Sequence, residues 1–197
     1  MYGFIKGVCT FILIIFGRWK VEGQENIPSQ GPLIIVCNHV SYWDPVLVGC
    51  AITREVRFMA KAEIFNYPVL KNILHMVRAF PIKRGQSDRN ALRTAINLLK
   101  KNEVIGVFPE GTRSKNGELL PFKPGVSMMA YKGECPVLPM AVINSRKVWI
   151  GWRYPVRVII GKPIFFHLTD QRPSGEALED MSAEISQAVA DLLKKSS

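Results

Sequence analysis

The chain has 197 residues, of which 48% are hydrophobic and 21% are charged, so it fits one folded domain and is not an intrinsically disordered chain. Lysine and arginine outnumber the acidic residues by 26 to 16, which gives a formal net charge of +10. A basic excess of this size favours an anionic partner: nucleic acid, anionic lipid headgroups or a phosphorylated substrate.

The first predicted element is an apolar segment between Lys6 and Arg18. It contains only the uncharged residues 7–17, whereas a helix that crosses a membrane needs about 20 apolar residues. No small-x-small cleavage site follows it, as a signal peptide would require, because Arg18–Lys20 comes next. The aromatic residues and flanking cations favour a helix in a membrane interface over a buried core helix. Residues 1–22 are therefore predicted to be an N-terminal membrane-associated segment.

Short apolar runs alternate with helical patterns along the rest of the chain. Runs rich in β-branched residues predict buried strands at 32–37, 56–59, 79–82, 104–108, 137–143 and 156–160. Apolar residues at spacings of three and four predict helices at 45–52, 67–77, 88–102, 126–131 and 174–195. Asp88 is the expected N-cap of the third of these helices, and Asn102 its end. This alternation predicts an α/β fold with helices covering a β-sheet.

A polar block follows the first predicted strand: Asn38 and His39, then Asp44 directly before Pro45. Asp44 is expected near the start of the next helix, because proline is favoured at the first helical position. A carboxylate bonded to one imidazole nitrogen fixes the tautomer and leaves the other nitrogen free as a base for a bound alcohol. On these residues alone, such a base and a simple helix cap by Asp44 or Ser41 are equally supported. Ser41 lacks the Gly-x-Ser-x-Gly context of a nucleophile.

A second polar block, 108–114, follows the predicted strand at 104–108. Gly111 provides a position where the backbone can take unusual angles. Thr112 and Ser114 provide hydroxyls, and the guanidinium of Arg113 can bind a phosphate through two N–H groups at once. Lys123 adds positive charge nearby. The block is not a Walker loop, and a polar surface turn is the alternative interpretation.

The remaining features carry less chemistry. An apolar strand ends in cations at Arg84, which is typical of a phosphate clamp or of a solvated strand end. Aromatic and basic residues mix between 146 and 157, which suits a membrane interface, base stacking or an exposed hairpin. His75 is expected in a helix and His167 at a strand end. The four cysteines show no metal-ligand spacing, so free thiols in a reducing cytosol are predicted, and no metal site.

Taken in order, these blocks resemble the glycerolipid acyltransferases, most closely the bacterial 1-acyl-sn-glycerol-3-phosphate acyltransferases, across residues 34–144. The first block of that family is Asn-His-x-Ser-x-x-Asp, which Asn38–Asp44 matches. The third, Phe-Pro-Glu-Gly-Thr-Arg-Ser, matches 108–114 residue for residue. The second block keeps Phe80 and Arg84, although the two residues before Phe80 depart from the usual pattern. The fourth is a looser, proline-rich strand.

The resemblance implies a mixed β-sheet flanked by helices, like that of the glycerol-3-phosphate acyltransferases. It implies acyl transfer from acyl-CoA or acyl carrier protein to the sn-2 hydroxyl of lysophosphatidic acid, giving phosphatidic acid in phospholipid biosynthesis. His39 is the implied general base, and Asp44 orients it. The residues implied to hold the phosphorylated acceptor are Arg84, Glu110, Gly111, Thr112 and Arg113. Asn38, Ser41, Ser114 and Lys123 are expected to support them.

The resemblance also sets expectations for the whole protein. The acyltransferase domain is expected at 23–197, held by the segment 1–22 at the cytoplasmic face of the cell membrane as a peripheral or monotopic protein. Its expected partners are lysophosphatidic acid, the thioester donor and the anionic membrane surface, with no nucleic acid and no cofactor besides the co-substrate. The alternatives are the same chemistry on glycerol 3-phosphate or another lysolipid, or a non-catalytic basic protein that binds membranes.

Overall fold

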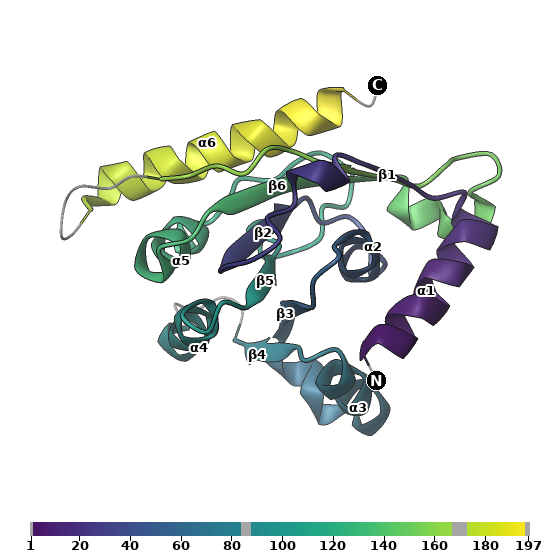
Figure 1. Ribbon diagram of the computed structural model, residues 1–197, viewed down its shortest axis with the longest axis horizontal. Helices are drawn as coiled ribbons and strands as arrows, with labels where there is room; N and C mark the ends of the chain where they lie inside the picture. The colour runs from purple at the N-terminus through teal and green to yellow at the C-terminus, as the bar shows by residue number, and fades with distance from the viewer. Residues whose placement is uncertain (1, 84–87, 167–172, 196–197) are drawn as a thin grey trace.

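The computed structural model describes residues 2–83, 88–166 and 173–195. Within them, one mixed sheet has the strand order β1-β7-β6-β2-β5-β3-β4 (Figure 1). The strands are β1 (Lys20–Glu22), β2 (Leu33–Cys37), β3 (Val56–Lys61), β4 (Phe80–Ile82), β5 (Val104–Val107), β6 (Val137–Ile143) and β7 (Arg157–Ile160). The α-helices are α1 (Tyr2–Gly17), α2 (Asp44–Ala51), α3 (Pro68–Met76), α4 (Arg89–Leu99), α5 (Gly125–Gly133) and α6 (Gly175–Lys194). Short 3-10 helices are η1 (Gln24–Asn26), η2 (Ala62–Asn66) and η3 (Ser145–Ile150). The predicted α/β fold with a mixed, helix-flanked sheet is confirmed.

The direction of the strands determines where a site can form. The central strand β2 pairs in parallel with β5 and β6, and β3 and β4 continue the parallel set beyond β5. β7 runs antiparallel to β6, and β1 pairs in parallel with β7. The carboxyl ends of β2, β5 and β6 therefore meet at one edge of the sheet, where ligand sites of parallel α/β folds are found.

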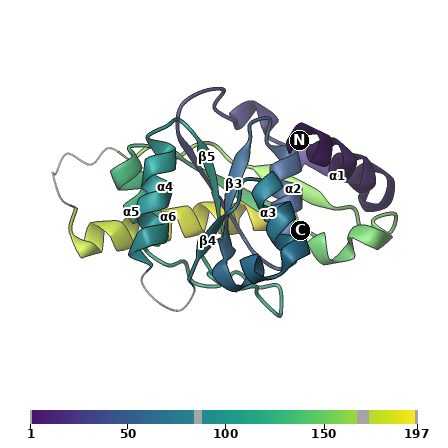
Figure 2. The ribbon, with the colours of Figure 1, turned by 90° about the horizontal axis from the view of Figure 1, so that it is seen from below.

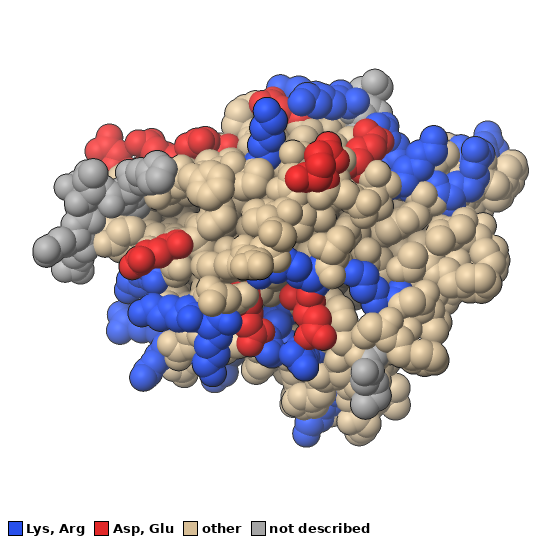
Figure 3. All heavy atoms as spheres, viewed as in Figure 1, with Lys and Arg blue, Asp and Glu red and all other residues tan. Residues whose placement is uncertain are grey.

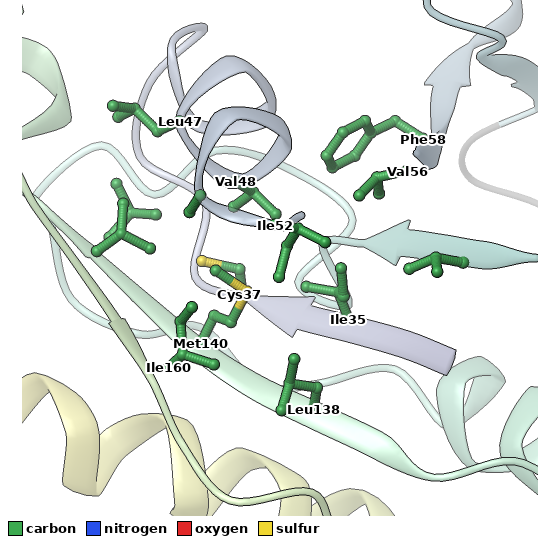
Figure 4. Packing of buried hydrophobic residues seen from close by; sticks show 14 of the residues in the cluster. Ile35, Cys37, Leu47, Val48, Ile52, Val56, Phe58, Leu138, Met140 and Ile160 are labelled. Carbon is green, nitrogen blue, oxygen red and sulfur yellow. The ribbon is translucent and has the colours of Figure 1, made fainter. Parts of the chain in front are cut away.

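Two apolar layers fix the sheet between its helices. On one face, Leu47 and Val48 of α2 pack over Ile35 of β2 and Met140 of β6 (Figure 4). The helices α4, α5 and α6 cover the other face, on which they pack against side chains such as Val36 (Figures 1 and 2). All five residues of β2 are buried, as a central parallel strand with two covered faces requires. This packing holds the end of β2, and with it the first polar block, rigidly in place.

Some local features differ from the predictions. Residues 20–22, predicted as part of the N-terminal segment, form β1 and belong to the sheet. The segment that connects the antiparallel strands β6 and β7 contains the 3-10 helix η3 followed by turns. Helix α4 ends at Leu99, and Asn102 takes a left-handed φ of 60° in the turn beyond it. The four cysteines are free thiols, as predicted.

The N-terminal apolar segment forms α1, which has 16 residues. At a rise of 1.5 Å per residue it is about 24 Å long. Among the described residues, no helix combines the length and the apolar character needed to cross a membrane.

Candidate active site

The imidazole of His39 is bonded to the carboxylate of Asp44, the first residue of α2. The distance from His39 Nδ1 to Asp44 Oδ2 is 2.8 Å, and Asp44 is completely buried. The same Oδ2 accepts the backbone N–H groups of Val40 and Ser41, both at 2.7 Å. These bonds hold the connection between β2 and α2 in a tight turn. The turn brings the side chains of His39 and Asp44 together. All three Oδ2 partners precede the helix, and the other oxygen, Oδ1, is buried without a hydrogen-bond partner among the described residues.

The contact with Asp44 fixes the protonation pattern of the ring. An ionised carboxylate oxygen can only accept a hydrogen bond, so Nδ1 carries the proton of the neutral imidazole. The lone pair is then on Nε2, which is the arrangement of a general base. His39 is 6% exposed, and its ring stacks on that of Phe108 with centroids 4.2 Å apart. The ring is therefore held in one orientation by a bond at one side and a stack on its face.

Both neighbouring strands hold the backbone around His39. The pairing of Leu33 with Val104 sets an offset of 71 residues between β2 and β5, and it continues beyond the strand ends. His39 therefore lies opposite Glu110, whose Oε1 accepts the His39 N–H at 2.5 Å. On the other side, the Asn38 side chain bonds both the N–H and the C=O of Val142 in β6, at 2.8 and 3.0 Å. These bonds tie the first block to β6 and to the second block.

Glu110 lies inside the protein, and not at its surface. It is 4% exposed, and its second oxygen, Oε2, accepts the backbone N–H of Leu120 at 3.0 Å. Burial raises the pKa of Glu110, while the two backbone N–H donors oppose that shift. This geometry differs from the phosphate contact implied for Glu110, because each oxygen serves a backbone amide and its charge has the same sign as phosphate. Its carboxylate instead joins the His39 loop to the segment before α5.

The rest of the second block turns toward solvent. Thr112 is exposed, and the Arg113 guanidinium lies 3.6 Å from the centroid of the Tyr42 ring and donates to its hydroxyl at 2.8 Å. Gly111 has φ +71°, a left-handed conformation that favours glycine, and a side chain there would meet the end of Lys123. The block thus presents cations and a hydroxyl at the sheet edge that also holds His39.

The supporting serines have internal partners. The Ser114 hydroxyl donates to Asn116 and accepts the N–H of Gly117, while the Ser114 N–H binds the carbonyl of His39 at 2.8 Å. The Ser41 hydroxyl donates to the carbonyl of Ser145 and accepts the N–H of Trp43. Both hydroxyls therefore shape loops. The predicted residues Arg84 and His167 lie outside the described residues.

An apolar cavity of about 280 Å³ lies next to this site. Met59 of β3, Leu92 of α4 and Met129 of α5 contribute apolar walls, and Lys83 and Lys123 also line it. Phe108 belongs to its lining as well, and the ring of this residue stacks on His39, so the cavity and the imidazole share a neighbour. The sequence could not predict this cavity, because its walls come from elements that only the fold brings together.

Three side chains at the site had no predicted role of their own: Tyr42, Phe108 and Arg146. The Arg146 guanidinium donates to the carbonyls of Val40 at 2.9 Å and of Lys115 at 2.8 Å, and also to that of Ser114. It therefore bridges the two polar blocks. Its position between an apolar strand and the aromatic cluster was the only signal in the sequence.

A family model described as Acyltransferase matches residues 18–143, a range that contains both polar blocks. The 1-acyl-sn-glycerol-3-phosphate acyltransferase of Bacillus subtilis is 32% identical over 99% of this chain and 98% of its own length. A chloroplastic 1-acyl-sn-glycerol-3-phosphate acyltransferase of Brassica napus, BAT2, is 35% identical over 76% of this chain, but the match spans only 46% of that longer relative.

A solved structure extends the comparison to the fold. The crystal structure of the 1-acyl-sn-glycerophosphate acyltransferase PlsC from Thermotoga maritima aligns with a TM-score of 0.69 at 29% sequence identity. The alignment covers 94% of this chain and 79% of that one. The resemblance seen in the sequence blocks is therefore confirmed across nearly the whole described fold.

Proposed function

Because this chain belongs to the acyltransferase family, we propose that it transfers an acyl group from a thioester to the sn-2 hydroxyl of 1-acyl-sn-glycerol 3-phosphate. The product is phosphatidic acid, an intermediate of phospholipid biosynthesis. The single observation that carries this proposal is the His39 Nδ1–Asp44 contact of 2.8 Å, which prepares Nε2 as a base at the edge of the sheet. The curated relatives and the solved neighbour, all named as enzymes of this reaction, support the choice of acceptor.

The proposed reaction needs no nucleophile from the protein. His39 Nε2 takes the proton of the acceptor hydroxyl while its oxygen attacks the thioester carbonyl. Asp44 stabilises the imidazolium that forms. The tetrahedral intermediate then expels the thiolate, which receives the proton from the imidazolium and leaves as a free thiol. The internal partners of the Ser41 hydroxyl agree with a direct transfer without a seryl ester.

The acceptor phosphate is proposed to bind at the exposed face of the second block. Thr112, Arg113 and Lys123 present a hydroxyl and two cations there. Arg84, which lies outside the described residues, is proposed to add a third cation. The bond to Tyr42 uses one of the five N–H donors of the Arg113 guanidinium, so others are left for phosphate oxygens. Glu110 is proposed to act through the backbone, by positioning His39.

The acyl chain of the donor is proposed to enter the apolar cavity beside Phe108. Phe108 lines this cavity and its ring stacks on His39, so the mouth of the cavity is proposed to open beside the imidazole, where the thioester carbonyl would lie. We propose acyl-CoA or acyl carrier protein as the carrier of that thioester.

A thiol-release assay tests the proposal. Purified protein is given lysophosphatidate and a series of acyl-CoA and acyl carrier protein thioesters, and free thiol and phosphatidic acid are both measured. The wild type should release thiol only when the acceptor is present. His39→Ala should lose the activity while its circular dichroism spectrum stays unchanged, because the side chain lies at the edge of the core. Near-normal turnover by His39→Ala would falsify the mechanism.

A panel of acceptors in the same assay tests the substrate. Glycerol 3-phosphate and a neutral lysolipid have the hydroxyl but differ from lysophosphatidate in acyl chain or phosphate. If the enzyme prefers one of these two compounds, that compound replaces lysophosphatidate as the proposed acceptor, and the proposed acyl-transfer reaction stays the same. Binding of lysophosphatidate without any thiol release would instead favour a non-catalytic membrane-binding protein.

A further inference from the structure

Tyr42 is an exposed tyrosine of the first polar block that contacts an arginine of the second. The residue is 76% exposed. The guanidinium carbon of Arg113 lies 3.6 Å from the centroid of its ring. An N–H of the same guanidinium donates to the Tyr42 hydroxyl at 2.8 Å. A stack and a hydrogen bond therefore hold the guanidinium in one place at the surface of the protein.

The backbone on both sides of Tyr42 is held by the turn that carries the base. Before it, the Ser41 N–H donates to the Asp44 carboxylate that orients His39. After it, the Trp43 N–H donates to the Ser41 hydroxyl at 3.2 Å. The phenol ring is therefore presented from the same turn that sets the position of the imidazole. A phosphate group bound beside Tyr42 has a defined position relative to the base.

The charge of Arg113 is not neutralised by a carboxylate. Other arginines of this protein are paired, as Arg57 is with Glu103 and Arg78 with Glu55. Figure 3 shows acidic side chains grouped with lysine and arginine side chains on one face of the molecule. In the described part of the chain, no salt bridge includes Arg113. An aromatic ring attracts a cation without cancelling its charge, so the stacked guanidinium can still bind an anion.

The pair formed by Tyr42 and Arg113 has hydrogen-bond donors of two kinds to spare. The bond between them uses one of the five N–H groups of the guanidinium. The tyrosine oxygen accepts in that bond, so its own O–H remains a donor, and no acceptor for it is present among the described residues. Because the two groups are 2.8 Å apart, an anion bonded to one lies within reach of the other. The pair therefore presents N–H and O–H donors to the same anion.

We propose that Tyr42 is a specificity-determining residue that makes the site select a phosphomonoester, the terminal phosphate of the acceptor. Its ring and its oxygen position Arg113, whose guanidinium binds two phosphate oxygens. Its own O–H donates to a third oxygen. A phosphomonoester has three unsubstituted oxygens, whereas in a phosphodiester the third is esterified and covered by its substituent. This inference rests on the proposed function, because it assigns the headgroup of the acceptor at that site.

Acceptor kinetics of Tyr42→Phe test this role, because phenylalanine keeps the ring under Arg113 and lacks the hydroxyl. The KM for a short-chain lysophosphatidate in solution should rise about tenfold, as expected when a hydrogen bond to a charged group is lost, while kcat stays within about twofold. Tyr42→Leu should raise the KM by about another two- to fivefold, because the stack is lost as well. Tyr154→Phe is the matched control, since Lys147 lies 3.6 Å from the centroid of that ring, outside the two polar blocks.

The split between KM and kcat distinguishes headgroup recognition from a structural role. Because the Tyr42 side chain is exposed, both variants should unfold at the wild-type temperature. A fall in kcat at constant KM would overturn the proposal, since it would mean that Tyr42 supports only the loop of His39. A KM for lysophosphatidate that stays at the wild-type value in Tyr42→Phe would overturn it as well.

Equilibrium binding separates this inference from the proposed function. Isothermal titration of His39→Ala protein with short-chain lysophosphatidate, a monoester, and with lysophosphatidylglycerol, a diester, gives both Kd values without turnover. The double variant His39→Ala/Tyr42→Phe should bind the monoester about tenfold more weakly and leave the Kd of the diester unchanged. That result supports the headgroup assignment even if the wild type releases no thiol. Equal Kd values for the monoester in the two proteins, or no binding of it by either, would overturn the inference.

Discussion

At the scale of single residues, the second block combines a side chain that faces solvent with one that faces the core. Arg113 stacks on Tyr42 at the surface, whereas three positions earlier Glu110 binds two backbone amides inside. Both residues belong to the same family block, yet they have different surroundings. Their substitution should therefore affect different kinetic constants.

Arg113→Ala should raise the KM for lysophosphatidate and leave the KM for the thioester nearly unchanged. A hydrogen bond to a charged group contributes about 1.5–3 kcal/mol, which predicts a rise of roughly 10- to 100-fold. Steady-state kinetics with each substrate varied in turn gives both constants. Lys101→Ala is the control for lost charge, because Lys101 is exposed before β5, at the opposite edge of the sheet. An unchanged acceptor KM would count against the phosphate role of Arg113.

Glu110→Gln should lower kcat more than it raises the KM for lysophosphatidate. The amide has one oxygen, so one of the two N–H groups, of His39 or of Leu120, would face an NH₂ group and lose its bond. A displaced His39 transfers protons less well, whereas the exposed phosphate-binding groups stay in place. A large rise in the KM for lysophosphatidate at constant kcat would instead support a direct contact between Glu110 and the acceptor phosphate.

The raised pKa of Glu110 predicts a pH dependence of stability. Burial, the main cause, makes the folded state bind the proton of this carboxyl more tightly than the unfolded state does. Ionisation of Glu110 therefore costs stability as the pH rises above its ordinary pKa of 4.5. The stability advantage of the wild type over Glu110→Gln should shrink as the pH rises from 4 toward 7. Urea unfolding across this range measures it, and a constant difference would contradict the shift.

At the scale of elements, local sequence patterns predicted those helices and strands that carry their own signal. The N-cap of α4 is an example, since the Asp88 side chain accepts two N–H groups of the first turn. Strand β1 was missed because Lys20–Glu22 has no apolar run, and only its pairing with β7 makes it a strand. The inward position of Glu110 depends likewise on the register between β2 and β5. The contact between His39 and Asp44 was predictable because both residues lie in one short block.

The helices α4 and α5 form a wall of the cavity, so a larger side chain there should shorten the acyl chain that the enzyme accepts. Leu92→Trp should lower kcat/KM for long-chain donors and spare short ones. Each methylene excluded from apolar contact costs about 0.8 kcal/mol, or roughly fourfold. A series of acyl-CoA donors measures the profile. Leu98→Trp, the same change on the same helix outside the cavity lining, is the control, and identical profiles for the two variants would refute the assignment.

At the scale of the whole protein, two arginines each donate hydrogen bonds to backbone carbonyls of separate loops, one at each edge of the parallel part of the sheet. Arg146 binds carbonyls of Val40 and Lys115 at the active-site edge. Arg54 binds carbonyls of Pro28 and Asn102 at the other edge. Because only Arg146 lies beside the active site, comparing substitutions of the two arginines separates an effect on fold stability from an effect on the geometry of the site.

Arg146→Gln and Arg54→Gln should both lower Tm, but only Arg146→Gln should also lower kcat with a soluble substrate. Each variant loses hydrogen bonds that contribute about 0.5–1.5 kcal/mol apiece, so a fall of several degrees is expected in both. Thermal unfolding and the thiol-release assay measure the two effects. Equal kcat in the two variants would mean that Arg146 stabilises the fold without positioning the site.

The pairing of β1 with β7 has a consequence for the order in which the protein forms. Lys20 pairs with Arg157, and η3, the partner of α1, also comes late in the chain. At about 5–20 residues per second, the ribosome needs roughly ten seconds to make the intervening residues. During that time α1 has emerged together with α2, which it also contacts, but without η3, so the side chain of Phe16 lacks the Trp149 ring on which it later packs. The sheet is completed only when β7 has emerged and pairs with β1 on one side and β6 on the other.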